Sequence, residues 1–304
     1  LGLNWALMAI VVEGRFFGLE RWINTERFRA FSTAQTARQT LPQWPAWVRH
    51  PALVVAWKDW HSLMRDRYFF FYKTVPGVLA PTIILLAGKY NARLMEHQFD
   101  LTGWFIPLYL GLALMIFVAQ ANLFVANHFG FERDQIAALL TAPADRKHLL
   151  WGKNLFLMAA LLPDMLVIAT FTLLLLPNPT VGLWVLVFLC LLSIVLILLG
   201  LGNLAAVLMP YFTPLDRPVI TLQGAVLVGL VNTALLIGLG LLMLPNLGLL
   251  LGPGYGWRQP WLYAISLPLW VVYNGVVYTL LTNAAAKLMP EYEEWIHLRV
   301  RGIL

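Results

Sequence analysis

Residues 181–209 read VGLWVLVFLCLLSIVLILLGLGNLAAVLM, a stretch with no charged residue. An α-helix rises about 1.5 Å per residue, so about 20 apolar residues cross the hydrocarbon core of a bilayer. The stretch lies between two turn signals, PNPT at 177–180 and Pro210, both of which favour the end of a helix. It therefore predicts one complete transmembrane helix.

Apolar stretches of similar length lie on both sides of this segment. Polar or Pro-containing breaks separate them, as at 89–100, 132–147 and 210–218. Together they predict about six spans, at 68–88, 103–127, 149–176, 181–209, 219–244 and 261–286. Residues 1–12 are mostly apolar but too short to span, so we expect residues 1–13 to be the end of a preceding transmembrane helix in a longer protein.

The composition supports the same fold class. Hydrophobic residues make up 60% of the 304 residues and charged residues only 12%, whereas a soluble domain is usually about 45–50% apolar and about 25% charged. We therefore predict an all-α, polytopic transmembrane helical bundle. The single cysteine, Cys190, allows no intrachain disulfide.

The positive charges are distributed unevenly across the predicted spans. If residue 13 emerges into the cytoplasm, all but three of the 21 Lys and Arg residues lie on the cytoplasmic side, the exceptions being Lys89, Arg93 and Arg258. This bias predicts that both ends are cytoplasmic. It also explains the net charge of +6 through attraction to anionic lipid headgroups, so we expect the lipid bilayer and no nucleic acid as a partner.

Two polar segments precede the first predicted span. Residues 14–52 form a cytoplasmic linker or, for the first half, a loop without regular structure. Residues 53–67 place apolar side chains at a helical period and charged ones between them, and an aromatic run follows at 68–72. The pattern predicts an amphipathic helix at the cytoplasmic interface.

The loop between the second and third predicted spans contains a short helix. Glu132 and Arg133 open it, Pro143 ends it, and one face is apolar. The apolar positions of that face are Ile136, Leu139 and Leu140. Such a helix can be bound by another protein, or it can pack on its own bundle, and the residues alone leave both interpretations open.

The order of these residues resembles a known family. Glu132-Arg133, Leu139-Leu140, Pro143, Arg146 and Gly152-Lys153 are similar to the E-R…L-L…P…R…G-K pattern of type-2 ABC exporter (ABC-2 type) permeases. Lys58-Asp59 and the residues up to Arg67 resemble the amphipathic elbow helix of the same family. Gly202-Asn203 and the Met-Pro-Tyr run at 209–211 are similar to the end of the fourth span in some members.

The resemblance implies a transport function. Such permeases form the substrate pathway of an ATP-driven exporter, usually as two six-span units, and a coupling helix (here about 131–142) docks on a separate ATPase subunit that binds the ATP. By that analogy the ATPase-coupling residues are Glu132, Arg133, Ile136, Leu139, Leu140 and Pro143. The resemblance also implies an inner (plasma) membrane and a second six-span unit, upstream in the same chain or in another subunit. It further suggests that 247–256 dip back into the membrane.

Catalytic motifs are missing from the sequence. It has no G-x-x-x-x-G-K-[ST] phosphate-binding loop, so we expect no ATPase site of its own. The six histidines show no spacing typical of a metal site, and we predict no cofactor and no enzyme activity.

Several polar residues fall inside the predicted spans. Asp164 follows Pro163, so it either faces a cavity or a partner, or it satisfies freed backbone groups or caps a helix end that Pro163 breaks. The amides Gln120, Asn203 and Asn232 are the other candidates, although buried amides more often bond between helices than mark a substrate path.

Altogether, the sequence predicts a permease domain at 53–290 and a cytoplasmic tail at 291–304. A non-catalytic membrane anchor or scaffold subunit is the alternative, because a bundle without a catalytic site fits that role too. An intramembrane enzyme or a secondary transporter fits less well, since it would need paired acids or histidines within the spans.

Overall fold

The computed structural model describes residues 50–65, 79–95, 102–126, 129, 139–140, 144–175, 180–210, 222–253 and 260–300. All of them belong to the larger of two compact units, Val48–Thr213 together with Ile220–Leu304. The predicted helix end at 1–13 and most of the linker at 14–52 lie outside the described residues.

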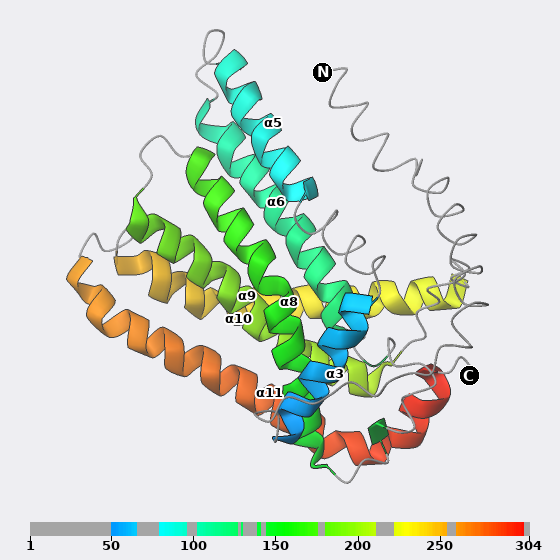
Figure 1. Ribbon diagram of the computed structural model, residues 1–304. Coiled ribbons are helices and arrows are strands. Elements are labelled where there is room, and N and C mark those ends of the chain that lie inside the picture. The colour runs from blue at the N-terminus through cyan, green and yellow to red at the C-terminus, as the bar shows by residue number, and fades with distance from the viewer. Residues whose placement is uncertain are drawn as a thin grey trace. The chain divides into compact units, whose positions relative to one another are not determined.

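The described residues are predominantly helical and include no strand (Figure 1). The α-helices are α3 (Pro51–Arg65), α5 (Ala80–Met95), α6 (Thr102–Val125), α8 (Arg146–Leu175), α9 (Val181–Leu208), α10 (Leu222–Leu251) and α11 (Tyr263–Val300). A 3₁₀ turn, η4 (Pro260–Leu262), leads directly into α11. The all-α prediction is confirmed for this part of the chain.

Four of these helices, α8, α9, α10 and α11, are long and apolar enough to cross a membrane. This indicates a membrane-embedded protein. The helix α5 has only 16 residues, and the part of α6 whose side chains are described contains a shorter apolar stretch, Gly111–Asn122. The described residues thus support four spans and not the six that we predicted.

The helix α9 matches its prediction within one residue at each end. Thr180 is its N-cap, and the Thr180 hydroxyl accepts a hydrogen bond from the backbone amide of Leu183 at 3.2 Å. Such a cap satisfies one of the amide groups that the first turn leaves without a helical partner. The turn signal before 181 therefore acts as expected.

The sequence predicts that the first span, 68–88, ends at residue 88, and this end is wrong. The helix in that region, α5, runs from Ala80 to Met95 and includes Lys89 and Arg93, which we interpreted as part of a break. Residues 68–78 lie outside the described residues. Lys and Arg have good helix propensity, so charge alone does not end a helix, and residues 89–95 contain no Gly or Pro.

The helix α10 continues past Pro245 to Leu251, although we expected it to end near 244 and the chain to re-enter the membrane at 247–256. Contacts from α11 support the helix on both sides of this proline. The Tyr273 hydroxyl donates to the Leu242 carbonyl oxygen at 2.9 Å, and Asn274 pairs with Asn246. A proline is tolerated within a membrane helix when neighbouring helices support the backbone around it.

The helix α11 also runs further than predicted, through Pro290 to Val300. Its 38 residues rise about 57 Å, nearly twice the thickness of a hydrocarbon core. Ile296 is fully buried, so packing holds part of the segment that we expect from the sequence to be a tail from 291 onwards.

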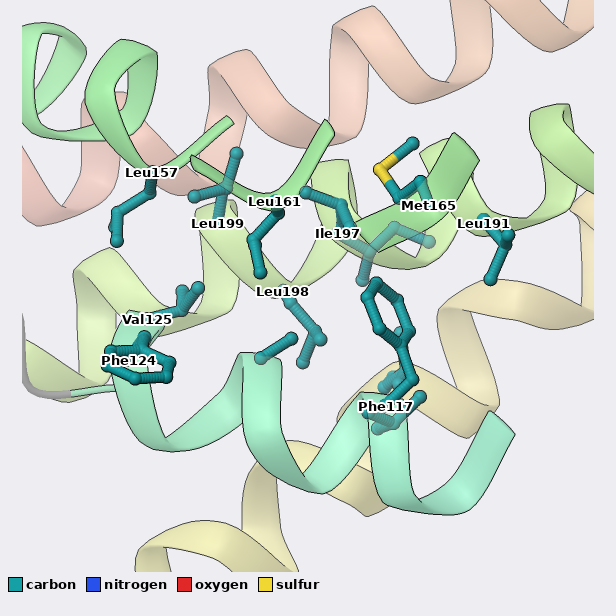
Figure 2. Close-up of a cluster of buried hydrophobic side chains, with 14 of the residues drawn as sticks. Phe117, Phe124, Val125, Leu157, Leu161, Met165, Leu191, Ile197, Leu198 and Leu199 are labelled. Atoms are coloured by element: carbon teal, nitrogen blue, oxygen red, sulfur yellow. The ribbon is translucent and has the colours of Figure 1, made fainter. Parts of the chain in front are cut away.

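The main core lies where α6, α8 and α9 meet (Figure 2). Phe117 of α6, Leu161 of α8 and Leu198 of α9 are all at most 2% exposed and belong to one cluster. Gly202 of α9 allows a close approach to α6, because a Cβ there would lie 2.8 Å from the Val125 carbonyl oxygen. The core thus depends on one glycine as well as on large apolar side chains.

A second core joins the start of α8 to the ends of α9 and α11. Its buried members are Phe129, Leu139, Leu140, Leu149, Leu150, Ala206, Val207, Ala285, Met289 and Ile296. The helix α3 packs on α8 (Figure 1), and Val55 of α3 contacts this second core. The beginning of α8 is therefore packed against parts of α3, α9 and α11.

Candidate functional site: the junction of α3 and α8

A buried ion pair joins α3 to α8. The Lys153 ammonium lies 3.0 Å from Oδ2 of Asp59, and the two side chains are only 3% and 8% exposed. Lys58 reaches the other carboxylate oxygen of Asp59 at 3.4 Å but is 31% exposed. Moving two charges out of water is costly, so this pairing needs close geometry to persist.

Gly152, directly before Lys153, brings the two helices into close contact. A Cβ atom at this position would lie 2.5 Å from the Ala52 carbonyl oxygen and 2.7 Å from Cβ of Val55. Only a residue without a side chain fits this approach. The Gly-Lys dipeptide thus does two things: Gly152 admits α3, and Lys153 binds it.

The first turn of α8 carries several further polar contacts. Oδ1 of Asp145 accepts a hydrogen bond from the backbone amide of Lys147 at 3.0 Å, which caps the helix. Arg146 forms an ion pair with Glu293 of α11. Because Arg146 contacts α11 and Lys153 contacts α3, the start of α8 is tied to both helices.

Aromatic rings add to this junction. The rings of His50 and His148 meet edge to face with centroids 4.7 Å apart, and His50 accepts a 3.2 Å hydrogen bond from the Ala52 amide at the start of α3. The Lys147 ammonium lies 4.9 Å from the centre of the Trp151 ring, within the range of a cation–π contact. We define the α3/α8 junction as His50, Ala52, Asp59, His148, Gly152 and Lys153.

Only two of the predicted ATPase-coupling residues are described. Leu139 and Leu140 are helical, and both are buried in the second core against the protein itself. Glu132, Arg133, Ile136 and Pro143 lie outside the described residues. At these two leucines, the apolar face of the loop therefore packs on its own bundle.

The amides that we singled out within the spans include two that bond between helices. Asn203 of α9 donates to the Thr282 hydroxyl of α11 at 3.0 Å, and Asn232 of α10 accepts from Asn122 of α6 at 3.0 Å. Gln120 of α6 is half-buried and has an interaction partner. Interhelical bonding, the more ordinary of our two interpretations, is what the structure shows for Asn203 and Asn232.

Asp164 is buried, and it too has an interaction partner. The helix α8 continues unbroken through Pro163, so the interpretation in which Asp164 caps a broken helix end is wrong. A buried carboxyl within an apolar helix is a functional candidate by default, because burying it is costly.

Sequence reasoning missed three other polar contacts between helices. Asn246 and Asn274 form a reciprocal amide pair between α10 and α11, with distances of 3.2 and 2.7 Å. The Asn154 amide of α8 donates to the Tyr278 hydroxyl of α11 at 2.8 Å. The Trp270 indole of α11 donates to the Ser193 hydroxyl of α9 at 2.7 Å.

The signal that could have found these contacts is an amide or hydroxyl inside an apolar helix. Asn246 follows a proline and Asn154 follows a lysine, so both resembled the boundary of a helix. Trp270 resembled a membrane-interface aromatic, because Trp is common at that level.

In chemical terms this site holds helices together. Among the described residues, no three His, Cys, Asp or Glu side chains gather closely enough to hold a metal ion. The fold and the junction define a helical membrane protein whose amphipathic helix, α3, is locked to one of its apolar helices. No protein-family model, no curated protein and no solved structure matches the chain.

Proposed function

We propose that this protein is the membrane-spanning permease of an ATP-driven exporter, which forms the substrate pathway and couples to a separate ATPase subunit. Four apolar helices long enough to span a bilayer support a membrane role of this kind. In this proposal ATP is bound and hydrolysed by the partner subunit, and the chain itself carries no cofactor.

The observation that carries the proposal is the α3/α8 junction. The two segments that resemble the exporter family, Lys58-Asp59 and Gly152-Lys153, meet through the Asp59–Lys153 ion pair and the close approach at Gly152. In this proposal α3 and α8 move together, because separating them would leave a buried charge without its counter-charge. A displacement of the loop before α8 by the ATPase would therefore move α3 and α8 together.

The burial of Leu139 and Leu140 separates them in role from the other predicted coupling residues. In the proposal these two leucines fasten the loop to the second core, and the residues around them, Glu132, Arg133 and Ile136, contact the ATPase. Motion of the ATPase then reaches the bundle through the leucines as well as through the start of α8.

The finer architecture also belongs to the proposal. Two more spans, formed with α5 and α6, complete a six-span unit in the inner (plasma) membrane with both ends in the cytoplasm. A second six-span unit, on the same chain or on another subunit, completes the substrate pathway.

A second candidate function, a membrane anchor or scaffold subunit, is favoured by one observation. Leu139 and Leu140 are buried in the protein's own core, which is what a loop without an external partner would show. This role requires no ATPase, so the two candidates differ in whether the loop before α8 affects ATP hydrolysis.

The test is charge reversal in that loop. Native membranes carrying the double variant Glu132→Arg, Arg133→Glu should lose permease-stimulated ATP hydrolysis while the protein remains in the membrane in normal amount. The matched control is Arg93→Glu, Glu96→Arg, a reversal predicted to lie on the opposite side of the membrane, which should retain the activity. Unchanged hydrolysis in the first variant would overturn the assignment of the loop and favour the anchor.

A further inference from the structure

Four uncharged polar side chains form a chain of contacts across α8, α9 and α11. Asn154 of α8 donates to the Tyr278 hydroxyl of α11 at 2.8 Å, and Asn203 of α9 donates to the Thr282 hydroxyl of α11 at 3.0 Å. The side chains of Tyr278 and Thr282, one helical turn apart, also interact. The chain of contacts therefore runs Asn154, Tyr278, Thr282, Asn203.

Asn154 and Asn203 each donate a hydrogen bond through the amide nitrogen, and neither uses its amide oxygen in these contacts. Asn154 is 3% exposed and Asn203 is fully buried, yet Oδ1 of each accepts no hydrogen bond within the part of the chain that the structure describes. A buried amide oxygen without a donor costs free energy comparable to a lost hydrogen bond. Two of them in one short chain call for a ligand that can donate hydrogen bonds.

We propose that Asn154 and Asn203 hold a buried water molecule between α8, α9 and α11. Buried waters typically make about three hydrogen bonds to polar groups that would otherwise remain unsatisfied. A water with two hydrogens can donate to both amide oxygens and accept from a neighbouring hydroxyl.

The two amides are connected through two hydroxyls on one face of α11. Tyr278 and Thr282 stand at i and i+4, which places their side chains on the same face of the helix. Each hydroxyl accepts from one amide, and the side chains of Tyr278 and Thr282 also interact. A water that donates two hydrogen bonds of about 2.8 Å can join two amide oxygens of such a network.

The charge of the site selects water over a cation. None of the four side chains carries a charge at neutral pH. The residue directly before Asn154 is Lys153, whose ammonium is already paired with Asp59. A metal ion would add positive charge beside an ammonium without any carboxylate of its own, which is unfavourable in an apolar interior.

The water has a mechanical consequence. A hydrogen bond through water is enthalpically close to a direct one and can be remade at a new geometry. The water-mediated contact between α8, α9 and α11 can thus be rearranged. It includes Asn154, which directly follows Lys153 of the buried ion pair between α8 and α3. This inference holds for the permease and for the anchor alike.

The direct test is a map of the intact protein in detergent or nanodiscs at a resolution that shows ordered water. We expect a density peak within about 2.7–3.2 Å of Oδ1 of both Asn154 and Asn203. If either oxygen instead accepts from a protein donor, or faces a space without density, the inference is overturned.

A second measurement separates water from a cation. Thermal unfolding of the intact protein is compared in sodium, potassium and choline chloride at equal ionic strength. A bound water predicts the same Tm in all three salts. A Tm that rises with sodium or potassium alone, and loses that rise in Asn203→Leu, would show a cation site and overturn the inference.

Discussion

The Asp59–Lys153 pair is a buried ionic contact between α3 and α8. Both partners are nearly inaccessible to solvent, and they belong to segments that are far apart in sequence. Replacing one partner strands the other charge in the interior, which typically costs about 3–5 kcal/mol, whereas replacing both with apolar residues of similar volume is often neutral.

The first prediction follows from that asymmetry. Asp59→Leu and Lys153→Met should each lower the free energy of unfolding by several kcal/mol, and the double variant should recover much of the loss. Thermal and denaturant unfolding in detergent measure this. Lys58→Met is the control, since this lysine is 31% exposed and a pair of that kind contributes about 0–1 kcal/mol. Equal effects at Lys58 and Lys153 would contradict the burial argument.

A second prediction concerns the close approach of α3 to α8. Gly152→Ala forces a Cβ against the Ala52 carbonyl oxygen and Val55, so it should destabilise the protein by about 1–3 kcal/mol through overpacking. Gly182→Ala, in the first turn of α9, adds a Cβ with nothing within 4 Å and should be neutral or slightly stabilising. Unfolding in detergent compares the two, and a harmless Gly152→Ala would show that the helices are not in contact.

Among the helices, periodicity and apolar length were good predictors, because both are local properties of the chain. The interior of α9 has no charge and its ends carry turn residues, so its bounds could be read directly. The continuation of α10 past Pro245 could not, since it depends on Tyr273 and Asn274 in another helix.

The same limit applies to the candidate site. The Lys-Asp and Gly-Lys dipeptides were visible in the sequence, but their pairing depends on how α3 packs against α8. Asn154, Asn246, Ser193 and Thr282 were missed for a related reason: whether an amide or hydroxyl in an apolar helix bonds to another helix is decided by tertiary contact.

A third prediction tests the long C-terminal part of α11. Ile296 is fully buried in the second core, so Ile296→Ala should cost about 2–5 kcal/mol of stability. Leu280→Ala, in the same helix at a side chain 63% exposed, should cost far less. Thermal unfolding in detergent measures both. If Ile296→Ala has no effect, the segment is the free tail that the sequence suggested.

For the complete bundle, the distribution of Lys and Arg predicts which ends of the helices face the cytoplasm. Four of the described helices are apolar and long enough to span a membrane. Cys190 is the only cysteine in the sequence, so a single-cysteine map of the topology is practical after Cys190→Ala.

The fourth prediction is the outcome of that map. With Glu294→Cys and Tyr90→Cys introduced one at a time, a membrane-impermeant maleimide added to intact cells should label position 90 and leave position 294 unlabelled until the membrane is opened. Both side chains are well exposed, so reactivity is not limited by burial. Labelling of both from outside would contradict the predicted topology.

The transport function is tested most directly by the composition of the complex in its own membrane. The protein is extracted gently in detergent, and mass spectrometry identifies the subunits that accompany it and their stoichiometry. An exporter permease predicts a soluble subunit with a phosphate-binding loop, in equal numbers with the six-span units. Recovery with other membrane subunits and without any ATPase would contradict the transport function and identify the chain as a structural component.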